Sequence, residues 1–538
     1  MNDQAYDVVV VGAGFGGTAC AGILAKRGFN VLCLDANSHA GGKAFTHEVH
    51  GHKVDMFTHL LSMGGRGRIA EALKLAGCNV AIHARPEAKW HQRHSPGVEF
   101  LEPPTACLFV YTDDGGKRRE LRVRRSLSLA NKLRMVRWLG IPPRKYPAAY
   151  KFMRMLVQMP DWQVDRLSAV PLAEWLQSLG VAPSLYDMAS LWCGLMFVHP
   201  ARFASAGEWI RHFRAIMSTM AAGYATGGCG SVPNAFCSVV EERGGNVSLR
   251  TRVERIIVEG GRAVGVTCAD GTEYRARAVV SNAGIQATVL GLLEQPDEHL
   301  SHEFLARVKE LVPSFGGIRV RYFLNDVVIP REIPATLVYD TSIREIDHLT
   351  WDEVQQVGSF SNLFSAVGTN GGAASKVVER FTQIPVVTTI PSNFDPSMSP
   401  KGTQALVCTA IAPPNPNLDE GVYGRLASLV DENVYSTFPE VEAAVVHRDV
   451  AGPPAIAAVS GRTAAGLPDV GAEAVGLAQI PSQVGLKKPD PALPIPGLFL
   501  VGCDAGGSGV GLEQAADSAI NVSRLVESFL WHVFLKKG

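Results

Sequence analysis

Four residues near the N-terminus have types and spacings that suit the binding of a nucleotide pyrophosphate. Gly12, Gly14 and Gly17 form the pattern G-x-G-x-x-G, and Asp35 follows 18 residues after the last glycine. Gly12 permits a tight turn, Gly14 lets the backbone approach the pyrophosphate, and Gly17 allows a helix to pack closely on a strand. An acid at this distance accepts hydrogen bonds from ribose hydroxyls. These residues therefore predict a dinucleotide-binding site.

The surrounding residues predict the elements that such a site requires. Residues 6–11 form an apolar run without a polar face, as expected of a parallel strand covered on both sides. We expect a helix over 18–27, with its free N–H groups and positive dipole directed at the phosphates. A second strand over 29–34 would place Asp35 at its end. Residues 8–25 also have the length of a membrane span, but the five glycines among them favour the strand–turn–helix unit.

The residues after Asp35 resemble a known family. Ala36 is followed by Gly41-Gly42-Lys43, which is similar to a segment of the flavoprotein superfamily that includes amine oxidases and phytoene desaturases. In that superfamily an acid ends the second strand and a Gly-Gly-Arg turn approaches FAD. Here the acid is Asp where Glu is more frequent, and Lys43 keeps the charge of Arg without its bidentate fork. The family's Asp-x-Gly is also altered, to Asp55-Met56-Phe57.

A second glycine-rich loop near the C-terminus favours FAD over NAD. A turn followed by a buried strand is predicted over 494–502, the glycine-rich loop 503–511 comes next, and a long helix follows over 512–534. This order resembles the closing FAD segment of the carotenoid desaturase group. The resemblance implies that Asp504 accepts a hydrogen bond from a ribitol hydroxyl, and that amides near Val510 stabilise negative charge on the reduced flavin. An NAD dehydrogenase has no need of such a second loop.

A third segment, in the middle of the chain, completes the resemblance. A helix over 231–243, short strands over 246–276 and the strand 278–284 are similar to the family's middle FAD segment, in which the backbone near Val253 holds the adenine. The resemblance implies that FAD is bound through these residues: Gly12, Gly14, Phe15, Gly16, Gly17, Asp35, Ala36, Gly41, Gly42, Lys43, Val253, Asn282, Ala283, Gly502, Asp504, Gly509, Val510, Gly511 and Leu512.

Three cofactor segments separated by two insertions predict discontinuous domains in an α/β fold. We expect a Rossmann-like FAD-binding domain from residues 1–80, 225–300 and 450–538. An inserted α+β substrate domain would comprise residues 81–224 and 301–449. With 538 residues, of which 46% are hydrophobic and 19% charged, the chain is long enough for both domains.

Composition excludes several other classes. The chain has 51 basic and 51 acidic residues, and this zero net charge disfavours a nucleic-acid partner. Its ten cysteines are scattered without zinc-ligand or redox-pair spacing, so we expect reduced thiols in a cytoplasmic protein. Four histidines, His47, His50, His52 and His59, lie close in sequence, but nothing beside a flavin requires a metal, and we expect none.

The charge is unevenly distributed. Residues 117–154 hold 13 Lys or Arg and one acid, a net charge of +12, interleaved with apolar residues. Three interpretations remain open: a docking surface for anionic lipid with Trp138 at the interface, a solvated basic face on helices, or a site for an anionic substrate tail. The first would make the protein peripheral on the inner face of a membrane.

The insertions suggest where a substrate binds. Residues 190–200 are rich in aromatic residues and methionine, and they suit either an ordinary core or the lining of an apolar pocket. His59 follows the altered loop 55–57, so we consider it a candidate for proton transfer near the flavin.

Together these features predict an FAD-dependent oxidoreductase of the desaturase or dehydrogenase type. It would move a hydride between an apolar, isoprenoid-like or cyclic substrate and flavin N5, with oxygen or a quinone as electron acceptor. A flavin amine oxidase is the alternative enzyme, although no aromatic pair of the kind such enzymes place near the flavin is identifiable in the sequence. A cofactor-free binding protein like the Rab dissociation inhibitors is a further alternative, which the intact glycine motifs disfavour.

Overall fold

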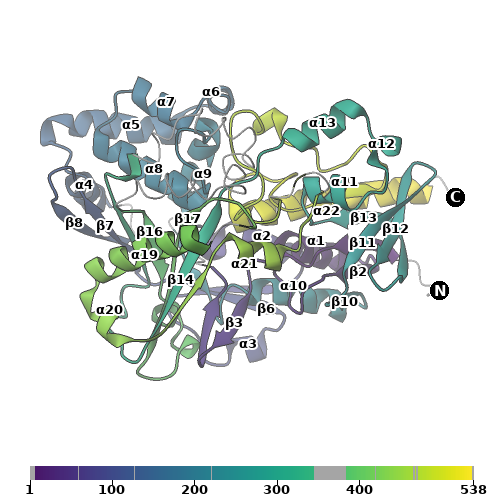
Figure 1. Cartoon of the computed structure of the whole chain (residues 1–538), viewed down its shortest axis with the longest axis horizontal. Helices are drawn as coiled ribbons and strands as arrows, with labels where there is room; N and C mark the ends of the chain where they lie inside the picture. The colour runs from purple at the N-terminus through teal and green to yellow at the C-terminus, as the bar shows by residue number, and fades with distance from the viewer. Residues whose placement is uncertain are drawn as a thin grey trace.

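Two large β-sheets, joined by helices, form the body of the protein (Figure 1). The computed structural model describes residues 6–57, 60–125, 128–219, 221–344, 383–417, 420–464, 467 and 470–535. The predicted His59 lies outside the described residues. None of the ten cysteines, all of which are described, forms a disulfide.

The first sheet contains both N-terminal strands predicted from the sequence. Its order is β10-β2-β1-β13-β12-β11, and β19 pairs with the C-terminal part of β13. Five of the seven strands are parallel, and β11 and β12 join them as an antiparallel meander. The bounds are β1 (Tyr6–Val11), β2 (Val31–Leu34), β10 (Asn246–Ser248), β11 (Val253–Glu259), β12 (Arg262–Cys268), β13 (Glu273–Ser281) and β19 (Leu498–Leu500).

Apolar packing covers both faces of this sheet, as the near-continuous burial of β1 requires. Val8 and Val10 face one helical layer, whereas Val9 and Val11 face the opposite side. The first layer is formed by α1 (Phe15–Lys26), α2 (Arg68–Leu75), α10 (Ser231–Glu242) and α22 (Gly511–Leu535). The opposite face packs against the meander, α11 (Ile285–Gly291) and α13 (His302–Glu310).

The second sheet is mainly antiparallel and has the order β18-β14-β17-β16-β15-β7-β8. One pair in it, β7 with β15, is parallel. The bounds are β7 (Thr105–Thr112), β8 (Arg118–Arg124), β14 (Gly316–Leu324), β15 (Ala335–Asp340), β16 (Val386–Thr389), β17 (Gln404–Ala412) and β18 (Val445–Ala451).

Helices cover this second sheet as well. On one face lie α19 (Glu420–Thr437) and α20 (Pro439–Ala444), whose apolar residues join one core with β14 and β17. On the other face α8 (Pro183–Met196) packs against β17. Figure 1 shows it within a helical group at one end of the molecule: α4 (Leu129–Trp138), α5 (Tyr146–Gln158), α6 (Asp161–Leu167), α7 (Leu172–Ser178) and α9 (Ala206–Thr219).

Small elements connect the two parts. A three-stranded sheet has the order β5-β6-β9, and β3 pairs with β4 in a hairpin. The bounds of these and the remaining α-helices are β3 (Thr46–Val49), β4 (His52–Asp55), β5 (Asn79–His83), β6 (Gly97–Leu101), β9 (Tyr224–Ala225), α3 (Trp90–Arg93), α12 (Pro296–His299), α18 (Pro391–Phe394) and α21 (Pro453–Ser460). Among the described helices, none combines the length and apolar character that a membrane crossing requires.

The predicted α/β class, with a Rossmann-like sheet and a second substrate-binding part, is confirmed. Several element bounds differ from the predicted ones. Helix α1 begins at Phe15, three residues earlier than expected, because Gly14 already has the extended backbone of an N-cap. β13 is one continuous strand where two short ones were expected, and β19 takes up three residues of the range 494–502, in which a turn followed by a strand was expected. The domain boundaries drawn from the sequence stay a prediction.

The basic segment 117–154 forms β8, α4 and α5 at the end of the molecule far from the first sheet (Figure 1). Most of its Lys and Arg side chains are exposed. Trp138, which one of the three interpretations placed at a membrane interface, is only 6% exposed. Its ring packs against Phe109, Tyr111 and Tyr339. The interfacial placement of Trp138 was therefore wrong.

Candidate functional site

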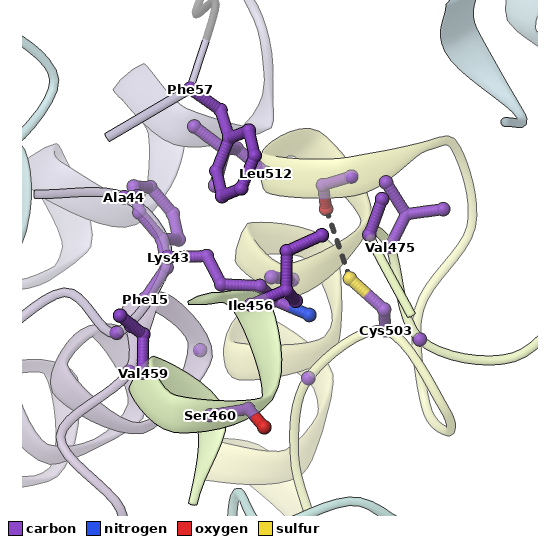
Figure 2. A pocket seen from close by; sticks show the side chains of 18 of the residues that line it. Phe15, Lys43, Ala44, Phe57, Ile456, Val459, Ser460, Val475, Cys503 and Leu512 are labelled. Carbon is purple, nitrogen blue, oxygen red and sulfur yellow. Dashed lines mark hydrogen bonds between the residues drawn. The ribbon is translucent and has the colours of Figure 1, made fainter. Parts of the chain in front are cut away.

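A cavity of about 790 Å³ lies between the two sheets, at the carboxyl ends of β1, β2, β13 and β19 (Figure 2). Ligands of α/β sheets bind at this edge, where strands end and helices begin. Sixteen of the nineteen predicted cofactor residues line it: Gly12, Gly14, Phe15, Gly16, Asp35, Ala36, Gly41, Gly42, Lys43, Val253, Asn282, Ala283, Gly502, Val510, Gly511 and Leu512. Gly17, Asp504 and Gly509 do not line it.

The first glycine turn leaves no room for side chains. Gly12 has a φ of +93°, which favours glycine. A Cβ on Gly17 would lie 2.0 Å from the carbonyl oxygen of Gly12, so this residue allows α1 to start directly against β1. A Cβ on Gly14 would lie 2.5 Å from Nδ2 of Asn282. The backbone at the start of α1 is therefore open to a ligand in the cavity, as a bound pyrophosphate requires.

Asp35 ends β2 and faces the cavity with its carboxylate held in place. Oδ2 accepts a hydrogen bond of 2.7 Å from the amide of Ala13, and Oδ1 accepts one of 2.7 Å from the amide of Asn37. Burial raises the pKa of Asp35, and the two amides oppose that rise. Each carboxylate oxygen has a second lone pair for a hydroxyl donor, and such a donor would favour the ionised form.

The second glycine turn brings a cation into the cavity. Gly41 and Gly42 have φ values of +101° and +58°, and the Gly41 amide donates a 2.7 Å hydrogen bond to the carbonyl of Ala13. Lys43 follows, and its Nζ donates to the carbonyl oxygen of Glu473 at 2.7 Å. Burial lowers the pKa of Lys43.

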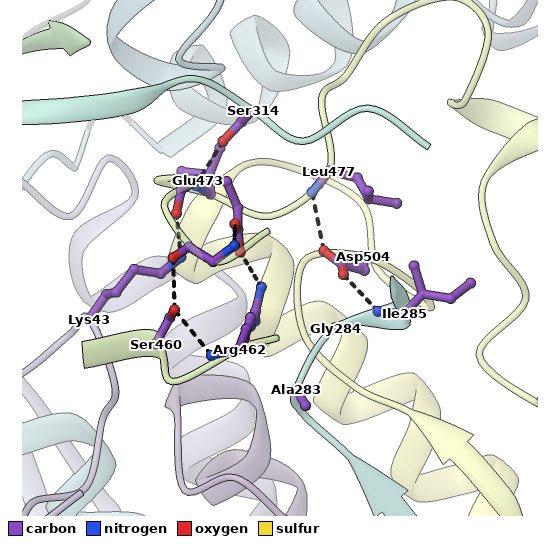
Figure 3. Close-up of polar contacts among 12 residues, drawn as sticks. Lys43, Ala283, Gly284, Ile285, Ser314, Ser460, Arg462, Glu473, Leu477 and Asp504 are labelled. Atoms are coloured by element: carbon purple, nitrogen blue, oxygen red, sulfur yellow. Dashed lines mark hydrogen bonds and ion pairs between the residues drawn. The ribbon is translucent and has the colours of Figure 1, made fainter. Parts of the chain in front are cut away.

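A second cation, which the sequence did not reveal, stands beside Lys43 (Figure 3). Arg462 Nη1 donates to Glu473 Oε1 at 2.6 Å, and Glu473 Oε2 accepts from the amide of Gly471 at 2.8 Å. The Arg462 guanidinium and the Lys43 ammonium hold the pKa of Glu473 below its usual range, although burial opposes them. Arg462 thus pairs directly with the carboxylate, whereas Lys43 contacts the backbone carbonyl of the same residue, and the three side chains together carry one net positive charge.

Asp504 lies next to the cavity-lining residues Gly502 and Cys503 but does not itself line the cavity. Its Oδ2 accepts a 2.9 Å hydrogen bond from the amide of Ile285, and its Oδ1 accepts a 3.1 Å hydrogen bond from the amide of Leu477 (Figure 3). The side chain lies behind the cavity wall, where it ties three loops together. Each of these oxygens keeps a second lone pair, so the contact with a ribitol hydroxyl stays a prediction.

Helix α22 starts at the cavity. Val510, Gly511 and Leu512 line the wall, so the free N–H groups and the positive end of the helix dipole face this space. Gly509 lies just outside the wall, and its carbonyl accepts a 2.7 Å hydrogen bond from Nε2 of Gln479. Negative charge in the cavity would be stabilised at this point.

The other half of the cavity is apolar. It is formed by α8, β14, β16 and β17, together with residues near β4, and its lining includes Phe57, Leu60, Leu61, Ser190, Leu191, Gly194, Leu195, Met196, Val198, Pro200, Gly316, Gly317, Ile343, Pro385, Val387, Thr409, Ala410 and Ile411. We call these residues the substrate half. Residues 190–200 therefore have both of the predicted roles. Several of them line the cavity, whereas Cys193 and Phe197 are fully buried in the core.

The described histidines of the N-terminal cluster have other contacts. Nε2 of His47 lies 2.9 Å from Nη1 of Arg321, His50 stacks on His447 at 3.9 Å, and Nδ1 of His52 lies 2.9 Å from Oγ of Ser399. The described part of the chain contains no group of three His, Cys, Asp or Glu residues that could hold a metal ion.

Comparison with known proteins identifies the family. The family model for flavin-containing amine oxidoreductases matches residues 15–316, more than half of the chain. The chain belongs to this family. Membership confirms the predicted flavin cofactor, FAD, and the glycine turns, Asp35 and the start of α22 fit it.

Curated relatives of this flavoprotein include carotenoid enzymes. It is 26% identical to the phytoene desaturase (neurosporene-forming) of Rhodobacter capsulatus over 298 residues, which cover 54% of each chain. It is 23% identical to the chloroplastic prolycopene isomerase of Daucus carota over 477 residues, which cover 83% of this chain and 69% of the relative. The first alignment thus spans about half of the relative's length.

Solved structures share the fold of this flavoprotein. An oxidoreductase from Methanosarcina mazei superposes with a TM-score of 0.66 at 17% identity, covering 96% of this chain and 100% of that one. The architecture therefore extends over both sheets. At this level of identity the likeness concerns the fold alone.

Proposed function

We propose that this flavoprotein is an FAD-dependent dehydrogenase of the desaturase type, acting on carbon–carbon bonds of an apolar, uncharged substrate. Bound FAD supplies a hydride acceptor at its N5 atom. The protein contributes positioning, exclusion of water and stabilisation of negative charge by Lys43, Arg462 and the start of α22. The proposed FAD ligands are the sixteen predicted residues that line the cavity.

One observation carries the proposed substrate class: where α8, β14, β16 and β17 line the cavity, none of their described residues has a charged side chain, and the titratable Glu513 and His212 come from α22 and α9. The polar side chains of the substrate half are the hydroxyls of Ser190 and Thr409. Burial of an ammonium group without a partner is costly, whereas an apolar chain gains free energy from the same burial. Phe57 is the one aromatic side chain in the described substrate half, so the aromatic pair expected of an amine oxidase is absent from these residues.

The named relatives support an isoprenoid-like substrate. A phytoene desaturase and a prolycopene isomerase act on long unsaturated hydrocarbons, and the apolar lining suits a substrate of this chemistry. The proposed reaction removes a hydride and a proton from adjacent carbons and leaves a double bond. The reverse direction or an isomerisation would use the same cavity.

The test is anaerobic bleaching of the flavin in the purified yellow protein. Candidate polyenes, terpenes, cyclic ketones and amines are added separately, and absorbance near the flavin maximum is followed. Bleaching by a polyene or terpene supports the proposal, whereas bleaching by amines alone favours the amine oxidase. A colourless protein that fails to take up FAD would favour the binding-protein alternative.

A cavity-filling variant tests whether the compound that bleaches the flavin binds in the substrate half. Gly317 lies on β14 without a positive φ, and a Cβ there would make only ordinary contacts of 3.5 Å or more. Gly317→Leu should occupy substrate space, slow bleaching by at least about tenfold and keep FAD bound. Gly424→Leu, on an open part of α19, is the control and should bleach as the wild type does.

A membrane surface is the proposed source of the substrate. A basic groove between β8 and α4 is lined by Arg119, Arg122, Arg124, Arg134 and Arg137. Nearby, on α5 and α6, three apolar side chains are exposed: Tyr150 at 67%, Val157 at 54% and Trp162 at 55%. Basic side chains beside exposed aromatic residues suit anionic headgroups and the membrane interface.

Binding to vesicles tests this surface. The wild type should bind vesicles that contain phosphatidylserine at low salt and release at high salt. Arg134→Glu with Arg137→Glu should weaken binding by more than about tenfold. The control pair Arg243→Glu with Lys309→Glu, on exposed positions of the other part of the molecule, should leave it unchanged. Equal binding of the two double variants to the vesicles would refute the proposal that this surface binds membranes.

The proposed electron acceptor is oxygen or a membrane quinone. Stopped-flow reoxidation of the reduced protein distinguishes the two. A faster reaction with a quinone in vesicles than with dissolved oxygen would identify the quinone, and the basic surface would then serve both substrates.

A further inference from the structure

Two side chains separate the main cavity from a second cavity at the surface. The second cavity has a volume of about 560 Å³ and lies where α2, α9 and the start of α22 meet. Glu513 and His212 line both cavities. Charged side chains line the surface side: Arg66, Arg68, Glu71, Lys74, Arg211 and Asp517. The wall between the cavities therefore contains two titratable groups.

Glu513 is almost completely enclosed, with 3% of its surface exposed. Its Oε2 accepts a 3.2 Å hydrogen bond from the amide of Ile69. Its Oε1 has no hydrogen-bond partner among the residues that the structure describes. A Cβ on Gly67 would lie 2.4 Å from this oxygen, so the glycine leaves space for the carboxyl group. A buried acceptor without a partner is costly and calls for a functional reason.

The surroundings of Glu513 favour a proton on its carboxyl group. Burial raises its pKa to about 7, assisted by Asp517 and opposed by the amides of residues 68 and 69 and by Arg68. His212 adds no positive charge, because burial lowers its pKa to about 4. Glu513 therefore changes its ionisation state near neutral pH, which suits a group that accepts and releases protons.

Arg68 and Arg211, two of the cations that line the second cavity, are paired with other carboxylates. Arg68 Nε lies 3.1 Å from Asp517 Oδ1, and Arg68 Nη1 donates to Glu71 Oε2 at 2.5 Å. On α9, Arg211 pairs with Glu208 at 2.6 Å. Because these arginines are neutralised by neighbouring acids, they lower the pKa of Glu513 less than unpaired cations would.

We propose that Glu513 transfers protons between the main cavity and the surface cavity. This inference rests on the proposed dehydrogenase function. Desaturation removes a hydride, which FAD accepts, and a proton from the adjacent carbon, whose bonding electrons form the new double bond. The ionised Glu513 takes up that proton and then releases it to water through the second cavity. In the direction of reduction the same proton moves inward.

A titration without substrate tests whether Glu513 ionises beside the flavin. Absorbance of the bound flavin is followed over about pH 5–9 in the holoenzyme, because a nearby charge shifts the flavin spectrum. The wild type should show a transition with a midpoint of about 7. Glu513→Gln should lack this transition, and Glu71→Gln, an acid that lines only the second cavity, should retain it. A flat titration of the wild type would overturn the proposal.

Single-turnover kinetics tests the transfer itself, with any substrate that bleaches the flavin. Glu513→Gln should slow bleaching by about 10²-fold or more and remove the inflection near neutral pH, which a purely structural role would leave in place. Unchanged rates and pH profile would overturn the proposal. Failure of every apolar substrate to bleach the flavin would refute the proposed function alone, since the titration needs no substrate.

A variant outside the main cavity tests the route. Ala215 on α9 lines only the second cavity, and Ala215→Phe should narrow it. The first turnover should proceed at the wild-type rate, whereas proton release, measured with a pH-indicator dye, should slow by at least about tenfold. Release at the wild-type rate would overturn the assignment of the second cavity as the path.

Discussion

Replacing Glu473 by Gln should destabilise the protein strongly, although the two side chains have nearly the same shape. The carboxylate faces Arg462, and the side chains of this pair are only 4% and 17% exposed. Lys43 donates to the backbone carbonyl of Glu473, and the charge of the Glu473 carboxylate favours the ionised form of Lys43 by opposing the fall in its pKa. The variant leaves two cations at the cavity wall without their main counter-charge, because Glu473 raises the pKa of both more than Asp504 does. Removal of one partner from a buried ion pair costs about 3–5 kcal/mol, so we expect a loss of this size in the free energy of unfolding.

Urea unfolding, followed by tryptophan fluorescence and by flavin circular dichroism, measures this loss. Glu432→Gln is the matched control, because Glu432 pairs with Arg425 at 3.0 Å on an exposed face of α19. An exposed pair contributes about 0–1 kcal/mol. The double variant Glu473→Gln with Arg462→Gln should recover part of the loss, since it removes one of the uncompensated cations.

The pH dependence of the same variant gives a second check. The pKa of Glu473 is lowered in the folded protein, so its stabilisation is complete at neutral pH and is lost as the pH falls through the folded pKa. The difference between wild type and variant should therefore shrink in acid. A loss of less than about 1 kcal/mol at neutral pH, equal to that of the control, would refute the reasoning.

Three further outcomes follow from the structure. The pKa of Glu513 rises from 4.5 to about 7 on folding, so the wild type should lose roughly 3 kcal/mol of stability as the pH rises from the first value to the second. Glu513→Gln should not lose this stability. The same pH dependence of the unfolding free energy in both proteins, measured with urea, would contradict the prediction. Gly17→Ala places a Cβ 2.0 Å from the Gly12 carbonyl and should release FAD on gel filtration, whereas Gly424→Ala, with open space around it, should keep FAD; retention by both would contradict the packing argument. Asp35→Asn should raise the Kd of FAD about tenfold to a hundredfold in fluorescence titrations, because charged hydrogen bonds to the ribose are lost; an unchanged Kd would exclude that contact.

The cofactor half of the site was predictable because its glycines meet requirements of the backbone that follow from their spacing in the sequence. Gly12, Gly14 and Gly17 fix a turn whose geometry depends on local spacing, and β1 follows from an uninterrupted apolar run. The strand β13 was divided in the prediction at Arg277, which interrupts the apolar pattern, although this residue is an exposed position within the same strand.

The rest of the site depends on tertiary contacts that no local pattern indicates. Arg462 and Glu473 lie eleven residues apart in a segment with no regular element between them among its described residues, so no periodicity marks them. Glu513 has the sequence context of an ordinary acid in the first turn of a helix, and its burial results from α2 crossing above it. Trp138 was misplaced because a tryptophan among arginines suits both an interface and a core.

The position of α22 has a consequence for how the protein is made. α1 packs against α22, and β19 completes the sheet beside β13, so the first and last parts of the chain complete one another. At about 5–20 residues per second, a ribosome needs roughly 25–100 s between these two helices. During this interval the apolar surface of α1 lacks its cover, and the FAD cradle lacks one wall. We therefore expect newly synthesised chains to need protection from aggregation until α22 has been made, and to acquire the cofactor only then.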